Sequence, residues 1–306
     1  MKKEEETPQR FASLSELHRI FGLPMPLHPL ISLISASNGT DINPPAGSHV
    51  LSFYKIALKP ELSRKIKYGQ GYYDFDEGGL LFAAPNQVVG GHNDDEVRVC
   101  SVYTLLIHPD FFLSYPLAKK IRQYGFFSYD AHEALHLSDK EKDTVISIFK
   151  IIDEELNSRI DDFSQDVIIS QIELLLNYAN RFYKRQFITR KAVSNDMLQK
   201  LEDILDEYFN SDVSLRQGIP TVQFLSAQLN MSPSYLSDML RSLTGQNSQQ
   251  HIHQKLIEKA KEKLSTTSLS VSEVAYELGF EHSQSFSKLF KTKTNLSPLE
   301  FRRSFN

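Results

Sequence analysis

The chain has 306 residues, of which 41% are hydrophobic and 24% charged, and its formal net charge is −4. This length and ordinary composition indicate about two domains that bury a core. No run approaches the roughly 18–20 apolar residues of a membrane span, and one cysteine excludes an internal disulfide framework and a multi-cysteine zinc site. The charged N-terminal residues lack the apolar stretch of a secretory signal, so we expect a protein of the reducing cytoplasm.

The charge is unevenly distributed along the chain. From Thr221 to the end there are ten Lys and Arg residues against seven Asp and Glu, which gives this segment a net charge of +3. Of the totals of 34 basic and 38 acidic residues, the remainder holds 24 and 31, a net charge of −7. The overall negative charge therefore does not exclude nucleic acid as a partner of the C-terminal part.

Residues up to Ile107 combine one short helix with a series of strands. The capping-box pattern Ser13–Glu16 predicts the helix, which prolines end from position 24 onward. Short apolar runs separated by Gly, Pro and Asn turns follow, at 30–34, 50–58, 72–75, 80–83 and 97–107. Strands of this length and spacing are typical of a small β-barrel or sandwich.

Two amphipathic helices come next. A capping box at Ser138–Glu141 opens the first, expected at 138–157, and apolar residues at helical spacing predict the second at 162–184. Two partners could cover the apolar stripes of these helices: a second subunit, or the barrel of the same chain. The sequence does not distinguish between these two alternatives. Residues 1–185 thus form the predicted N-terminal domain, followed by a basic linker at 186–195.

The remaining residues, 196–306, have helical patterns throughout, so the predicted fold class is α+β: a small β-barrel domain with flanking helices, then an all-α domain. Ser232-Pro233 places an N-cap before a proline at the first helical position, and Ser270–Glu273 is a further capping box. Two helix-turn-helix units are expected at 221–243 and 271–292, joined by a connector helix at 247–264. The connector's lysines are expected to point largely outward: Lys255, Lys259, Lys261 and Lys263.

Polar side chains lie near the start of each second helix, where helix-turn-helix proteins contact base edges in the major groove. The candidate base contacts are Ser234, Tyr235, Ser237, Ser283, Gln284, Ser287 and Lys288. Basic residues near the helix ends are candidate phosphate contacts, which set affinity without reading sequence: Arg241, Lys291, Arg302 and Arg303. We expect Gln284→Ala to change base preference and Arg302→Ala to weaken binding to all sequences alike.

Four motifs stand out in the C-terminal residues: VSEVAYELGF from Val271, SFSKLFK from Ser285 and LSPLEFR from Leu296, with LNMSPSYLS from Leu229 in the first unit. They resemble the DNA-binding domain of AraC/XylS-type transcriptional regulators. The resemblance extends from Leu201 to Phe305. It implies that double-stranded DNA is the partner and that the two recognition helices enter neighbouring major grooves.

Three residues depart from the family's pattern. Ser226 stands where a small alanine is usual, and Asn295 replaces a glycine but tolerates left-handed geometry. Asp238 occupies a position where many members carry arginine; its carboxylate could accept a hydrogen bond from cytosine N4 but would repel phosphate.

The stretch GYYDFDEGG from Gly71, followed by FAAPNQ from Phe82, is similar to cupin-like sensor regions found ahead of this domain in many such regulators. The resemblance implies a homodimer and a small-molecule effector, and a contact with RNA polymerase if the protein activates transcription. Aromatic residues could line an effector pocket, with core packing as the alternative: Tyr54, Tyr68, Tyr72, Tyr73, Phe75 and Phe82.

Two patterns raise enzyme chemistry as an alternative. His132-Glu133-Ala134-Leu135-His136 matches the zinc-protease motif, which requires a sustained helix; because a new helix starts at Ser138, we interpret it as a surface connector. A metal-dependent cupin needs an H-x-H pair, which His49, His92 and His108 do not provide. We predict no enzyme, metal or cofactor. The alternatives are a metal cupin or H-E-x-x-H hydrolase fused to a DNA module, and a barrel that only dimerises.

Overall fold

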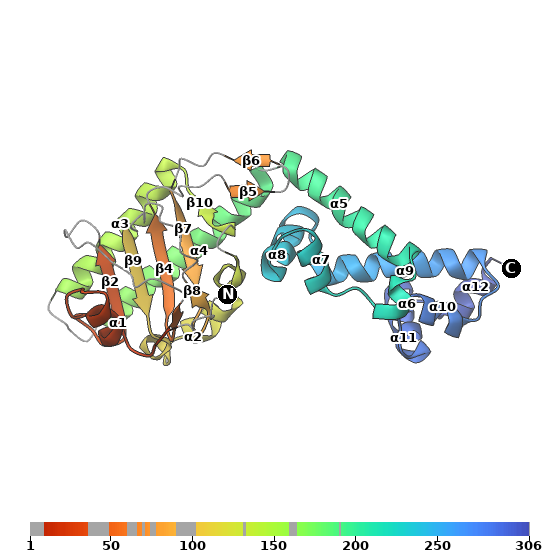
Figure 1. The fold of residues 1–306 in the computed structure, drawn as a ribbon, viewed down its shortest axis with the longest axis horizontal. Helices are drawn as coiled ribbons and strands as arrows, with labels where there is room; N and C mark the ends of the chain where they lie inside the picture. Colours follow the sequence, from red (N-terminus) through yellow and green to blue (C-terminus); the bar gives the residue numbers. More distant parts are fainter. Residues whose placement is uncertain are drawn as a thin grey trace, which may run out of the picture. The chain divides into compact units, whose positions relative to one another are not determined.

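A computed structural model of the chain describes residues 9–35, 49–59, 66–68, 71–73, 78–89, 102–130, 133–158, 164–189 and 191–305. The chain divides into two compact units, Met1–Gln186 and Phe187–Asn306 (Figure 1). The first contains the strands and the two long helices that the sequence predicts, and the second is helical.

The first unit is built on a five-stranded antiparallel sheet of order β10-β7-β4-β9-β2. Its strands are β2 (Ile31–Ser35), β4 (Tyr54–Lys59), β7 (Gly79–Ala83), β9 (Tyr103–Ile107) and β10 (Leu135–His136). The other strands are β1 (Gln9–Phe11), β3 (His49–Leu51) and β8 (Val88–Val89), which form a second sheet, and the pair β5 (Ile66–Tyr68) and β6 (Gly71–Tyr73). The strands that the structure describes form open sheets, and the predicted barrel closure is not seen among them.

The two long helices pack on one face of the five-stranded sheet. Tyr103 of β9 stacks on Phe149 of α3 (Asp139–Asn157), with ring centroids 5.2 Å apart. Phe82 of β7 contacts Tyr183 of α4 (Ser164–Thr189) at 6.3 Å. Since Phe149 and Tyr183 are buried within one chain, packing on their own sheet accounts for these parts of the apolar stripes.

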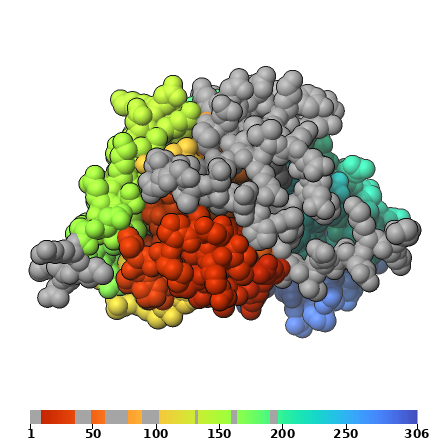
Figure 2. Space-filling model, turned by 60° about the vertical axis from the view of Figure 1, so that its left-hand side comes forward, coloured from red at the N-terminus to blue at the C-terminus, as the bar shows by residue number. Residues whose placement is uncertain are grey.

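The opposite face of this sheet packs on α1 (Leu14–Ile20) and the second sheet. Leu106 of β9 belongs to a buried cluster with Phe11, Leu14 and Leu51. Ser13 accepts a hydrogen bond from the Glu16 N–H, which confirms the predicted N-cap of α1. Figure 2 shows the red N-terminal residues on the surface of this unit. A short helix, α2 (Leu117–Lys120), follows β9.

The second unit contains the last residues of α4, 187–189, and eight further helices within the described residues 191–305. They are α5 (Lys191–Asn210), α6 (Val213–Gln217), α7 (Val222–Gln228), α8 (Pro233–Thr244), α9 (Ser248–Thr266), α10 (Val271–Glu277), α11 (Ser283–Thr294) and α12 (Pro298–Arg303). Helix α5 starts inside the predicted linker 186–195, because that stretch contains no proline or glycine to interrupt a helix. Helix α6 was not predicted.

Candidate nucleic-acid interface

The two helix-turn-helix units share one turn chemistry. In the first, Asn230 has a φ of 57° and the next N–H, of Met231, donates to the Ser226 carbonyl at 2.9 Å. In the second, Gly279 has a φ of 88° and the Phe280 N–H donates to the Ala275 carbonyl at 3.0 Å. A hydrogen bond across five residues beside a left-handed residue ends each first helix sharply, so that the second helix of each unit starts in a new direction.

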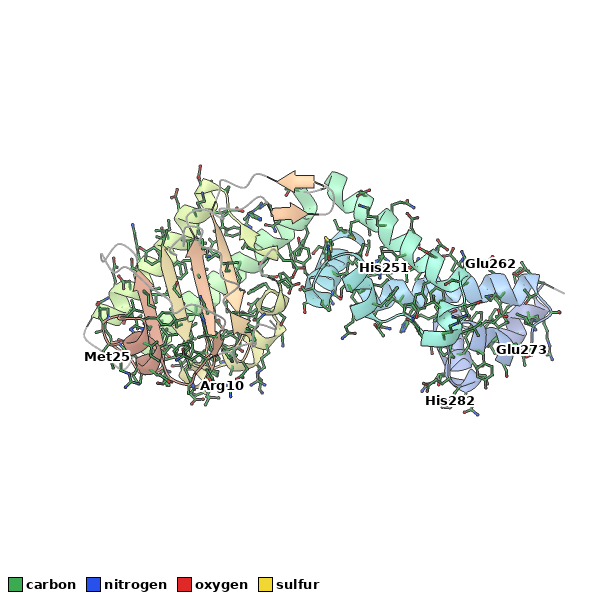
Figure 3. The ribbon with its side chains drawn as sticks, in the orientation of Figure 1. Arg10, Met25, His251, Glu262, Glu273 and His282 are labelled. Atoms are coloured by element: carbon green, nitrogen blue, oxygen red, sulfur yellow. The ribbon has the colours of Figure 1, made fainter. Side chains whose placement is uncertain are left out.

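Caps and apolar contacts complete each unit. Ser232 accepts from the Tyr235 N–H at the start of α8, and Ser270 forms the predicted capping box with Glu273 at the start of α10. His282, labelled in Figure 3, directly precedes α11 and makes no capping side-chain hydrogen bond. The interiors are apolar and fully buried at Leu225, Leu236 and Leu240 in the first unit and at Val274, Ala275, Phe286 and Phe290 in the second.

The candidate base contacts of α11 are accessible. Gln284 and Lys288 are exposed, and Ser283 and Ser287 are half-buried. Their spacing places all four along one side of the helix near its N-terminus, since residues three and four apart are neighbours on a helix surface. The predicted reading face of the second unit is therefore available to a ligand.

Helix α8 presents a smaller polar face than predicted. The expectation that Tyr235 is exposed is wrong: it is 1% exposed, because its ring packs on Phe187 with centroids 5.1 Å apart. Ser234 and Ser237 are both half-buried, and the Ser237 hydroxyl is already hydrogen-bonded to the Ser248 hydroxyl at 2.9 Å.

The candidate phosphate contacts differ in their surroundings. Lys291 and Arg303 are exposed, whereas Arg241 donates to the carboxylate of Asp238 at 2.8 Å. Arg302 donates from Nε to the Leu264 carbonyl, at 3.1 Å, in the last turn of α9. Carbonyls of a last helical turn lack partners within their helix, so Arg302 ties α12 to α9. A substitution there would alter folding as well as any DNA contact, so the exposed Arg303 is the better position at which to test a phosphate contact.

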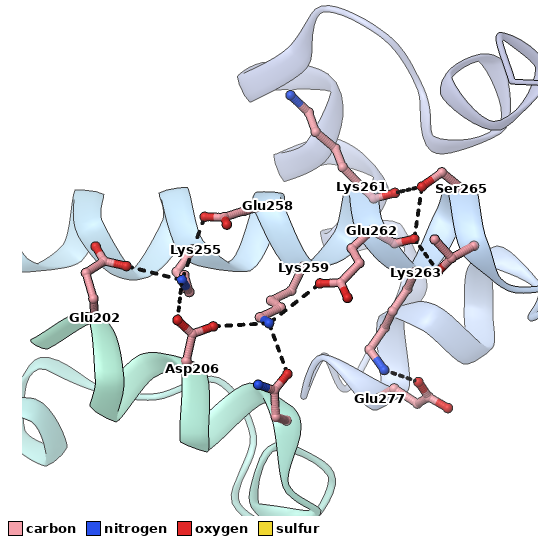
Figure 4. Close-up of polar contacts among 12 residues, drawn as sticks. Glu202, Asp206, Lys255, Glu258, Lys259, Lys261, Glu262, Lys263, Ser265 and Glu277 are labelled. Atoms are coloured by element: carbon pink, nitrogen blue, oxygen red, sulfur yellow. Dashed lines mark hydrogen bonds and ion pairs between the residues drawn. The ribbon is translucent and has the colours of Figure 1, made fainter. Parts of the chain in front are cut away.

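The connector helix carries a cluster of ion pairs that the sequence did not reveal. Lys255 is only 9% exposed at its side chain, and its Nζ lies 2.7 Å from Asp206 Oδ2 and 3.2 Å from Glu202 Oε2, both on α5 (Figure 4). Lys259 is 12% exposed and its Nζ lies 3.1 Å from Asp206 Oδ1. The prediction that these two lysines point outward is wrong, whereas Lys261 is exposed.

These contacts shift the pKa values of both partners. The hydrogen bond from Lys255 is the largest cause that lowers the pKa of Asp206. Burial by itself would lower the pKa of Lys255, but the hydrogen bonds from Nζ to Asp206 and Glu202 outweigh it and raise that pKa. The charged forms of both residues are therefore favoured, and the cluster clamps α5 onto α9.

We expect Asp206→Ala to lower the free energy of unfolding by about 1–2 kcal/mol, because it removes the carboxylate shared by two lysines of which one is nearly buried. The effect stays below that of a fully buried pair, since the Asp206 side chain is 41% exposed. Urea unfolding followed by circular dichroism measures it.

Asp196→Ala is the matched control, because Asp196 pairs on the same helix with Lys200 at 2.8 Å but both side chains are largely exposed. It should change the free energy of unfolding by less than about 0.5 kcal/mol. The Asp206 contribution is present above the ordinary aspartate pKa and is lost as the pH falls through its lowered folded value. Equal effects of the two substitutions would contradict the assignment.

Two of the candidate effector residues lie among the rings of the first unit. Tyr54 is 7% exposed and contacts Phe127 at 5.0 Å, and half-buried Phe82 contacts Phe126 at 4.5 Å, on the face of the sheet that the helices cover. Core packing thus accounts for Tyr54. The side chains of Tyr68, Tyr72 and Tyr73, and all of Phe75, lie outside the described residues.

The H-E-x-x-H sequence does not form the helix that its zinc chemistry requires. Leu135 and His136 form strand β10, which pairs with β7, and Glu133 is 1% exposed and accepts a hydrogen bond from the Asp130 N–H at 2.7 Å. The interpretation of this sequence as a surface connector is wrong, because residues 133–137 are buried. His132 lies outside the described residues. Within the residues that the structure describes, no three His, Cys, Asp or Glu side chains gather as a metal site, and no helix could span a membrane.

Comparison with known proteins finds matches to the C-terminal part of the chain. Residues 225–304 match the family model of the helix-turn-helix domain. An uncharacterised HTH-type transcriptional regulator in the cgkA 5′ region of Pseudoalteromonas carrageenovora is 36% identical over 119 residues, which are 39% of this chain and 63% of that protein. The chain therefore matches less than two thirds of this relative's length.

Two solved structures are also similar to this part of the chain. The C-terminal domain of the response regulator YesN from Fusobacterium nucleatum is 32% identical, covering 35% of this chain and 98% of that domain, with a TM-score of 0.31. The DNA-binding domain of AdpA, solved with a target DNA, is 25% identical and covers 34% of this chain and 91% of that one, with a TM-score of 0.30. The family match identifies residues 225–304 as a helix-turn-helix domain, and the relative similar to this part of the chain is named an HTH-type transcriptional regulator.

Proposed function

We propose that the whole protein is a sequence-specific DNA-binding transcriptional regulator in which α8 and α11 enter neighbouring major-groove segments. The observation that carries this is the pair of helix-turn-helix units with the same turn hydrogen bond, Met231 to Ser226 and Phe280 to Ala275. Helix N-terminal residues in this position contact base edges, a role we assign first to Gln284 and Lys288.

The remaining contacts follow from exposure. The short side chains of Ser234, Ser283 and Ser287 contact further bases. The exposed Lys291 and Arg303 bind phosphates. Arg241 binds a phosphate as well if its ion pair with Asp238 breaks when DNA binds. Phosphate contacts position the domain, and base contacts supply the specificity.

For the first unit we propose a cupin-like sensor that binds a small-molecule effector and joins two copies of the chain. The five-stranded sheet, covered by the long helices on one face and by α1 with the second sheet on the other, supports a sensor of that architecture. A regulator of this kind acts on DNA in the cytoplasm, contacts RNA polymerase when it activates transcription, and performs no catalysis of its own.

Selection of genomic DNA fragments by the purified full chain tests the proposal. We expect a small set of fragments with a shared sequence to be enriched, and to bind at least about 10³-fold more tightly than unrelated DNA of equal length at the same salt concentration. If every fragment bound alike, the protein would not be a sequence-specific regulator. Repeating the selection with candidate metabolites tests the sensor.

A further inference from the structure

The segment that precedes the first helix-turn-helix unit contacts the second. This segment, residues 211–220, contains α6 and leads directly into Thr221, the N-cap of α7; we call it the strap. The Ser214 hydroxyl, on α6 and 1% exposed, donates to the Glu277 carbonyl of α10 at 2.7 Å. Because carbonyls of a last helical turn lack partners within their helix, the strap supplies a specific bond at the end of α10.

Backbone also meets backbone at the turn of the second unit. A Cβ atom built on Gly279 would lie 2.5 Å from the Gly218 carbonyl carbon, 2.7 Å from the Gly218 oxygen and 2.8 Å from the Ile219 nitrogen. Real Cβ atoms do not approach other atoms this closely, so only glycine allows the strap to rest on this turn. The left-handed φ of 88° at Gly279 adds a second reason for glycine.

Tyr208 of α5 fixes the other side of the strap. Its hydroxyl donates to the Gly218 carbonyl at 3.0 Å, and its ring contacts Phe224 of α7 with centroids 4.9 Å apart. A continuous set of contacts thus runs from α7 through Tyr208 and Gly218 to Gly279. The connector helix α9 also contacts the second unit: the Nζ of Lys263 lies 2.7 Å from the carboxylate of Glu277 on α10, as drawn in Figure 4.

We propose that the strap is a second, direct tie between the two helix-turn-helix units, in addition to the connector α9, and that it fixes their separation and rotational phase. A single helix between two bodies permits bending and twisting, whereas a second connection elsewhere on both bodies opposes these motions. Gly279 and Ser214 are then specificity-determining positions: they set which spacing between two DNA elements the protein accepts. This inference rests on the proposed function.

The test compares binding of the full chain to a selected DNA fragment and to derivatives with one base pair added or removed between its two contacted elements. One base pair rotates the elements by about 35°, because a turn of DNA holds about 10–10.5 base pairs. We expect the wild-type affinity to fall about tenfold or more with either change, and that of Gly279→Ala, which displaces the strap, to fall less than about threefold.

Gly245→Ala is the matched control. Gly245 has a similar φ of 78°, at the end of α8, but a Cβ there would meet nothing within 4 Å. It should therefore keep the wild-type dependence on spacing. If Gly279→Ala fails to fold, Ser214→Ala tests the strap instead, because it removes only the hydrogen bond to Glu277. Its control is Ser211→Ala, since the Ser211 hydroxyl forms hydrogen bonds only within residues 208–213.

The outcomes separate this inference from the proposed function. Absence of any sequence-specific binding by the wild-type protein would contradict the proposed function. Specific binding with wild-type spacing dependence in the folded Gly279→Ala variant, or in Ser214→Ala, would overturn the role of the strap, as would a wild-type protein that tolerates every spacing.

Discussion

Phe286→Ala is expected to destabilise the second unit by about 3–5 kcal/mol and to abolish specific DNA binding. Phe286 is fully buried on α11, and its ring contacts Phe280 at 5.4 Å and Phe290 at 5.7 Å. The three rings join the turn of the second unit to its recognition helix. A cavity at this point removes the contacts that orient α11, so the loss of stability and of DNA binding share one cause.

Unfolding by urea, followed by circular dichroism, measures the effect, and Tyr276→Ala is the control. Tyr276 lies on α10 of the same unit but is 50% exposed, so its removal should cost less than about 1 kcal/mol. A Phe286→Ala protein as stable as the Tyr276→Ala protein would show that the aromatic cluster does not hold α11.

Gln284→Ala is expected to relax base preference at one position of the bound DNA, by about 1–3 kcal/mol of discrimination. Gln284 is exposed in the first turn of α11, where its amide can donate and accept toward one base, adenine being the best match in the major groove. Arg303→Ala should instead weaken binding to all sequences about equally, because Arg303 is an exposed cation at the end of α12 and phosphates carry no sequence information.

Binding of both variants to a library of single-base changes in a selected fragment distinguishes the two effects. We expect a position-specific change for Gln284→Ala and a parallel shift of all affinities for Arg303→Ala. If both variants lowered every affinity in parallel, α11 would not read bases through Gln284.

The parts of the fold that could be predicted from sequence are those set by local chemistry. The capping boxes at Ser138 in the first unit and Ser270 in the second form as predicted, and the left-handed residue Asn295 ends α11 with a φ of 63°. These features depend on a few neighbouring residues, so their patterns are sufficient. In the first unit, alternating apolar runs likewise predicted β2, β4 and β9.

Side-chain roles that depend on distant partners could not be predicted. Lys255 turns inward because carboxylates 49 and 53 residues earlier in the chain, those of Asp206 and Glu202, lie beside it. Tyr235 is buried by Phe187, and Arg302 is held by a carbonyl 38 residues away. Helix α6 escaped prediction because its five residues are too few to show a periodicity.

Guanine methylation interference on a selected fragment directly tests whether two recognition helices of this protein enter neighbouring major grooves. Methylation at N7 blocks contacts in the major groove. We expect two groups of interfering guanines on one face of the DNA, with centres about 10–10.5 base pairs apart, and loss of one group in a protein carrying both Gln284→Ala and Lys288→Ala. A single group of interfering guanines in the wild-type complex, or two groups on opposite faces of the DNA, would contradict this expectation.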